Sequence, residues 1–174
     1  MSLMALQDWK DSFASVPKVS DQTWKDNLGD WVYNNTSKYG SEEGMVLAGY
    51  TPPANIDFQF DKDTFAGSFP DSGAILDFNT VLAVAWEAAI LTSIWVITPP
   101  MTNPAFTAVA SVTVEPPSLI LGKAFLLSMV LVNVDDAKDS VIIPALRSAF
   151  LALTYTVAGT IGGSPATLTL QGVQ

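Results

Sequence analysis

Long apolar segments, spaced with the period of a helix, dominate the second half of the chain. These segments cover residues 81–98, 119–134 and 141–161. The last of them places Phe150 and Val157 on one face of a helix that we expect to span about residues 141–158. We therefore predict that three apolar helices form the core of the protein.

Polar residues and prolines mark where these helices begin and end. Asp77 or Asn79 can cap the first helix, and Pro99-Pro100 stops it, because proline cannot continue the hydrogen-bond ladder of a helix. Pro117 can occupy the first position of the second helix, where no backbone N–H is needed. A further amphipathic helix is expected at about residues 21–39.

Shorter stretches alternate apolar and polar residues, as half-buried strands do. The run NIDFQF at residues 55–60 and the run AFTAVASVTV at residues 105–114 both show this pattern. Residues 153–170 fit either the end of the last helix, which we prefer, or a hairpin around a Gly-Gly-Ser-Pro turn. The predicted fold class is mainly α (α+β), with a helical core of three apolar helices and short antiparallel β-strands.

Charge is distributed unevenly along what we expect to be a single domain of residues 1–174. Residues 1–77 form an acidic, aromatic-rich N-terminal part with 12 acidic residues and 5 lysines. Residues 78–174 form an apolar, core-forming part with 5 acidic and 3 basic residues. The net charge of −9 disfavours nucleic acid and anionic membrane surfaces as partners, because both are themselves negative.

The apolar segments resemble membrane spans in hydrophobicity but differ from them in length and charge. A span needs about 20 consecutive apolar residues, whereas residues 81–98 number 18 and include Glu87. Residues 119–134 number 16 and include Lys123. A charge at the centre of a span costs roughly 2.5–3.5 kcal/mol on insertion scales. We predict a core packed against protein, with membrane association disfavoured but not excluded.

Charged residues inside the apolar segments, namely Glu87, Lys123 and Arg147, have apolar neighbours three and four positions away. None of them therefore lies on an ordinary solvated helix face. The simplest interpretation is that each side chain extends to solvent from the edge of the core. A sharper hypothesis is that Glu87 pairs with Lys123 or Arg147, inside the core or in an interface.

The chain contains no Cys and no His. This excludes disulfides, nucleophile–histidine catalysis and the commonest metal ligands. We expect no cofactor and no catalytic residue. The carboxylates of Asp57, Asp61 and Asp63 remain as a weak candidate for a Ca²⁺ or Mg²⁺ site.

The stretch Asp61-Lys62-Asp63-Thr64 follows an apolar strand and resembles the DxDx[TV] signature of haloacid-dehalogenase phosphatases. The resemblance implies a nucleophilic Asp61 and a general acid at Asp63. The strand of that family lies in a parallel sheet and is continuously apolar, whereas the strand here alternates with Asp57 and Gln59. We therefore interpret the stretch as a solvated turn.

The composition suggests a function in assembly. With 14% charged and 49% hydrophobic residues, the chain has more apolar surface than one small domain easily hides. Ala85, Ala89 and Ser93 form a row of small residues, interface candidates that permit close approach of a helix from the same chain or a second one. Our first hypothesis is a non-catalytic structural or assembly protein that acts as a homo-oligomer, for example a virion or phage component.

Two other functional classes stay open as hypotheses. The first is a lipid- or membrane-active binding protein whose apolar helices line a cavity or open onto a bilayer. The second is a carboxylate-based, metal-dependent hydrolase. No signal peptide is visible in the first ten residues, so a soluble, cytoplasmic protein is the default expectation for localisation.

Overall fold

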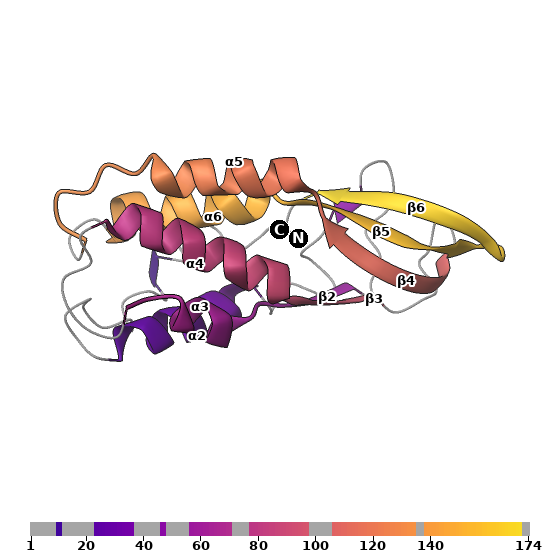
Figure 1. The fold of residues 1–174 in the computed structure, drawn as a ribbon, viewed down its shortest axis with the longest axis horizontal. Coiled ribbons are helices and arrows are strands. Elements are labelled where there is room, and N and C mark those ends of the chain that lie inside the picture. Colours follow the sequence, from indigo (N-terminus) through magenta and orange to yellow (C-terminus); the bar gives the residue numbers. More distant parts are fainter. Residues whose placement is uncertain are drawn as a thin grey trace.

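The computed structural model describes residues 10–11, 23–36, 46–47, 56–70, 77–97, 106–134 and 138–171. The described chain is elongated, with helices gathered at one end and a curved sheet at the other (Figure 1). Helices and two small antiparallel sheets together confirm the predicted α+β class.

The helical end contains the three predicted apolar helices and two further ones. The apolar helices are α4 (Phe78–Thr92), α5 (Pro116–Leu127) and α6 (Ile143–Leu151), with a π-helical turn at Lys138–Ile142 before α6. The two further helices are α2 (Trp24–Thr36) and α3 (Lys62–Gly67). α4 lies between two groups of helices, because α5 and α6 pack on one side of it and α3 and α2 on the other (Figure 1).

The strands form two separate antiparallel sheets. The larger sheet contains, in spatial order, β1 (Val46–Leu47), β6 (Ser164–Gln171), β5 (Thr154–Ile161) and β4 (Phe106–Val114). The smaller sheet pairs β2 (Ile56–Gln59) with β3 (Ile94–Ile97). β2 and β4 are the two strands predicted from alternation, and both predictions are confirmed.

The first apolar helix is shorter than predicted. Asp77 caps α4 as expected, and its carboxylate accepts hydrogen bonds from the first turn. The helix ends at Thr92 instead of residue 98, and the Ser93 hydroxyl donates to a carbonyl of the last turn at 2.6 Å. The residues that follow form β3, since β-branched residues favour a strand where a partner is available. α5 likewise ends at Leu127 and not near residue 134, while Pro99-Pro100 lies outside the described residues.

The preferred prediction of a helix to residue 158 is wrong, and the hairpin alternative is correct. α6 ends at Leu151, and β5 returns as β6 through Gly162-Gly163. These glycines have φ values of 56° and 83°, the left-handed conformation that a tight two-residue hairpin turn requires. Tyr155 and Val157 are fully buried, with half-buried residues between them. This two-residue period is that of a strand.

Aromatic rings form the centre of the core. Phe150 of α6 lies there, and its ring centroid is 5.7–6.4 Å from those of three residues on other elements, Phe58, Phe60 and Trp86. Trp95 of β3 and Tyr155 of β5 have centroids 4.2 Å apart and connect the smaller sheet to the larger one. Side chains from the acidic first part and the apolar second part of the chain therefore share one core.

Candidate functional site

α4 and α5 lie side by side in opposite directions, and polar contacts hold them at two places. Asn79 Nδ2, near the start of α4, donates to the carbonyl oxygen of Met129, just beyond the end of α5, at 2.6 Å. Near the middle of both helices, Lys123 Nζ lies 2.7 Å from Glu87 Oε2. Together these contacts set the register of the two helices.

The ion pair lies at the edge of the core, because the side chains of Lys123 and Glu87 are 29% and 31% exposed. The structure thus brings together one of the two pairs that the sequence suggested. Arg147 of α6 takes no part in it. Its Nε is buried and has no hydrogen-bond partner among the described residues.

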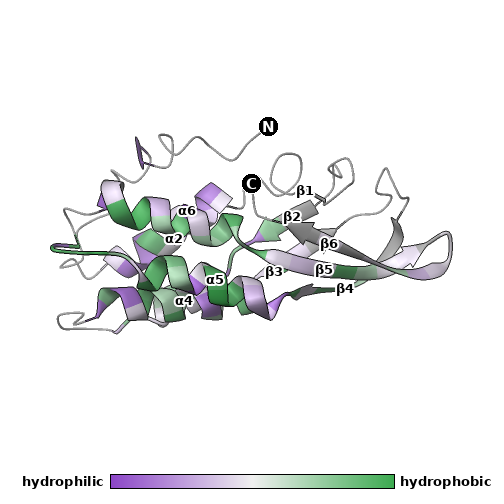
Figure 2. Cartoon of the chain, turned by 90° about the horizontal axis from the view of Figure 1, so that it is seen from above, coloured by the Kyte–Doolittle hydropathy of each residue, from purple (hydrophilic) through white to green (hydrophobic). Residues whose placement is uncertain are grey.

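The surface that surrounds this ion pair is apolar. Large aliphatic side chains are exposed on the same side of both helices as the ion pair, and we call the surface that they form the α4–α5 face: Val84, Leu91, Ile120 and Leu127. Glu87 and Lys123 each have an exposed aliphatic residue three positions before them and four positions after them. Figure 2 shows hydrophobic colouring along most of α5, in which Lys123 is the one charged residue. The ion pair therefore sits within an apolar surface.

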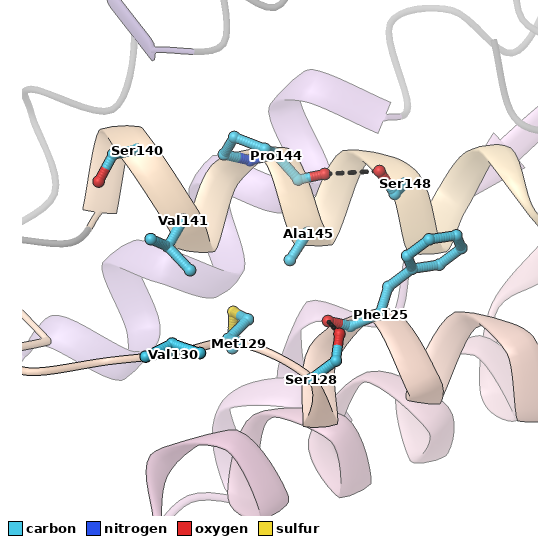
Figure 3. A pocket seen from close by; sticks show the side chains of 9 residues that line it. All are labelled: Phe125, Ser128, Met129, Val130, Ser140, Val141, Pro144, Ala145 and Ser148. Carbon is cyan, nitrogen blue, oxygen red and sulfur yellow. Dashed lines mark hydrogen bonds between the residues drawn. The ribbon is translucent and has the colours of Figure 1, made fainter.

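Exposed apolar residues continue beyond α5, where Val130 and Val132 are 81% and 100% exposed. Beside this segment, a pocket of about 380 Å³ lies between the end of α5 and the start of α6 (Figure 3). Its side chains are uncharged: Phe125, Ser128, Met129, Val130, Ser140, Val141, Pro144, Ala145 and Ser148. The Ser148 hydroxyl donates to the Pro144 carbonyl of its own helix at 2.8 Å. The pocket therefore offers apolar contacts and no ionisable group for catalysis.

The predicted row of small residues points into the chain and not toward the α4–α5 face. Ala85 and Ala89 are fully buried inside the chain. The hydroxyl of Ser93 is half-buried and accepts a hydrogen bond from the backbone N–H of Asp61 at 3.0 Å. These three interface candidates thus pack within the chain and are not part of the α4–α5 face.

The carboxylate of Asp61 caps α3. It accepts hydrogen bonds from Thr64 N at 2.9 Å and from Thr64 Oγ1 at 2.7 Å. Asp63 is exposed, and the side chain of Asp57 lies outside the described residues. No three acidic side chains come together to hold a metal ion in the part of the chain that the structure describes.

The local fold also differs from that of the phosphatases whose signature the Asp-Lys-Asp-Thr stretch resembles. β2, which precedes the stretch, pairs antiparallel with β3, and every strand pair among the described residues is antiparallel. Burial raises the pKa of Asp61, but the hydrogen bonds from Thr64 lower it, and the resulting pKa is below the ordinary value of 3.8. The ionised carboxylate suits the cap of a helix, and both of its oxygens accept hydrogen bonds from Thr64.

No helix among the described residues is both long and apolar enough to cross a membrane. Comparison of the chain with protein-family models, with curated proteins and with solved structures gives no match. The 12 residues of α5 contain a single charge, and this scarcity of charge is the sequence signal for the α4–α5 face.

Proposed function

We propose that this protein is a non-catalytic assembly protein that associates with a second copy of itself through the α4–α5 face. The observation that carries the proposal is the exposure of its four large apolar side chains, between 47% and 69%, around one ion pair. Large exposed apolar patches on water-soluble domains commonly mark association surfaces, because burying apolar area contributes about 25 cal/mol per Å².

The position of the charges favours a second copy as the occupant. A two-fold axis parallel to the helices and midway between them would place α4 of one copy over α5 of the other. The same axis would bring Glu87 of each copy over Lys123 of its partner. Opposite charges would then meet at the centre of the interface, and no like charges would be opposed there.

A lipid surface is a weaker match for the same face. Lys123 is the one basic residue on α4 and α5, and it is already paired with Glu87. The chain as a whole has a net charge of −9, so an anionic bilayer would repel it. Apolar contact with protein requires no such attraction and is consistent with both observations.

Sedimentation equilibrium of the full chain tests the proposal. We expect the wild-type protein to associate reversibly, and Leu91→Glu or Ile120→Glu to raise the dissociation constant at least about tenfold, equivalent to about 1.4 kcal/mol. Asn34→Glu is the matched control, because Asn34 is exposed on α2, on the other side of the molecule. This variant adds the same charge and should leave association unchanged.

A wild-type protein that stays monomeric at high concentration would contradict the proposal. Flotation with vesicles of neutral phosphatidylcholine identifies the lipid alternative. If the wild-type chain does not self-associate but floats with these vesicles, and Leu91→Glu abolishes flotation, the α4–α5 face would be assigned to lipid.

A further inference from the structure

β4 forms one margin of the larger sheet, on the side away from β6 (Figures 1 and 2). No strand among the described residues pairs with its outer edge. Edge strands in natural proteins usually carry charges or prolines that prevent pairing with other chains. The nine residues of β4, FTAVASVTV, include neither.

The hydrogen bonds to β5 show which backbone groups of β4 face outward. Glu115 N donates to Thr154 O at 2.8 Å, directly after the aligned pair Val114 and Tyr155. Because bonded and non-bonded pairs alternate along antiparallel strands, Thr113 is bonded to β5. The N–H and C=O groups of Val112 and Val114 point away from the sheet.

Irregular pairing is confined to the first part of β4. Register shifts lie between Phe106 and Ala108 and between Val109 and Ser111. Bulges of this kind turn an edge away from partners. From Ser111 to Val114 the register is regular, and Ser111 and Thr113 are exposed. The second part of β4 is thus a regular, uncharged strand edge.

We propose that β4 pairs antiparallel with β4 of a second copy, about a two-fold axis at Thr113. In this register, Val112 of each copy lies opposite Val114 of the other, and their outward N–H and C=O groups satisfy one another. The two Thr113 side chains lie opposite each other, a favourable cross-strand pair. The occupant is a second copy because the edge sequence Val112-Thr113-Val114 is symmetric about Thr113, so that two copies related by this axis present the same groups to each other.

This contact is distinct from the α4–α5 interface. An axis that pairs antiparallel β4 strands is perpendicular to the sheet, whereas the axis proposed for the α4–α5 face runs parallel to the helices. The two surfaces also lie at different ends of the long molecule (Figure 1). One chain would therefore form two different symmetric contacts, and their alternation produces assemblies larger than a dimer.

The experiment uses the full chain in two backgrounds, wild type and Leu91→Glu. Thr113→Lys places two like charges directly opposite each other at the proposed axis. We expect it to reduce wild-type assemblies to dimers and the Leu91→Glu protein to monomers in sedimentation equilibrium. Thr167→Lys, an exposed position on β6 of the same sheet, is the matched control and should change neither.

A cross-linking variant tests the register directly. The chain has no Cys, so Thr113→Cys provides one thiol per copy. Non-bonded antiparallel pairs have Cα atoms about 4.5 Å apart, within the range for a disulfide. Under oxidation in the Leu91→Glu background, Thr113→Cys should form a covalent dimer on a non-reducing gel, and Thr167→Cys should not.

Failure of this inference and failure of the proposed function give different results. A Leu91→Glu protein that is monomeric at all concentrations, with no cross-link through Thr113→Cys, would overturn β4 pairing and leave the α4–α5 interface standing. If Leu91→Glu leaves association intact while Thr113→Lys abolishes it, the α4–α5 proposal fails and β4 pairing stands.

Discussion

The indole ring of Trp86 lies against the backbone of Gly122, so closely that a Cβ built on Gly122 would meet Trp86 Cη2 at 2.3 Å. Trp86 is fully buried. Its ring fills the space between α4 and α5 only because α5 has no side chain at this point. The contact sets how near the two helices lie, and hence the shape of the α4–α5 face.

We expect Gly122→Ala to destabilise the protein although alanine is the better helix former. Overpacking of this kind costs about 1–3 kcal/mol, which exceeds the gain of roughly 1 kcal/mol in helix propensity. Gly67→Ala is the matched control, because Gly67 ends α3 and a Cβ there would meet nothing within 4 Å. Urea denaturation measures both. Equal stability of the two variants would contradict a tight contact at Gly122.

Among the residues at the centre of the core, Phe150 should cause the largest loss of folding stability when its side chain is truncated. Its ring contacts rings from β2, α4 and the residue after β2, and it is fully buried. Phe150→Ala should lower the free energy of unfolding by about 3–5 kcal/mol, because it leaves a cavity that these rings cannot close. Val132→Ala, at a fully exposed position, should change it by less than about 0.5 kcal/mol. A loss at Phe150 no larger than that control would show that the rings repack.

The Glu87–Lys123 pair should contribute little to the folding of a single copy. Partly exposed pairs have coupling energies of about 0.2–1 kcal/mol. A double-mutant cycle with Glu87→Gln and Lys123→Met, made in a Leu91→Glu/Thr113→Lys background in which both proposed contacts are broken, should give a value in this range that falls as salt is added. In the associating protein the same cycle, measured on the dissociation constant, should give a larger coupling. A coupling to association near zero would place the pair outside the interface.

Acid should destabilise the protein partly through Asp61. Its pKa in the folded state lies below the ordinary value of 3.8, so the ionised carboxylate stabilises the fold above that pH. The contribution is lost as the pH falls through the folded-state pKa. Asp61→Asn retains a capping oxygen but cannot titrate, and its stability should fall less steeply on acidification. Asp61→Ala also loses the cap and should cost about 0.5–2 kcal/mol at neutral pH. Parallel acid-denaturation curves for Asp61→Asn and wild type would rule out this role.

The starts of the helices could be predicted because their signals are local. Asp77 lies three residues before Thr80, whose N–H and hydroxyl donate to it. Pro116 and Pro117 occupy the first turn of α5, as proline does where no N–H donor is required. Such signals depend on neighbours within one helical turn, so they are visible in the sequence alone.

The ends of the helices depend on partners far along the chain. Residues 94–97 could have continued α4, but they pair with β2, about forty residues earlier, where Ile97 is aligned with Ile56. Residues 154–158 could have continued α6, but they pair with both β4 and β6. Apolar periodicity alone does not reveal such pairing, and short apolar runs fit helix and strand equally well.

The ion pair of the candidate site could be predicted from the sequence, but the exposed apolar surface around it could not. The apolar neighbours of Glu87 and Lys123 indicated that the two could pair, and they do. The exposure of Ile120 and Leu127 could not be predicted, because α5 is apolar on nearly every side and its sequence does not distinguish a buried face from an outer one. Only the packing of α4 and α6 against α5 determines which side chains remain outside.

The burial of the tryptophans determines what intrinsic fluorescence can report. Of the five in the chain, Trp24, Trp31 and Trp86 are buried in the core and Trp95 is half-buried beside Tyr155. The α4–α5 face and β4 contain none. Emission from these four described tryptophans should therefore shift to longer wavelength on unfolding and barely respond to self-association. Ile120→Trp would add a fluorophore to the α4–α5 face, so that folding and association could be followed as separate optical signals in one sample.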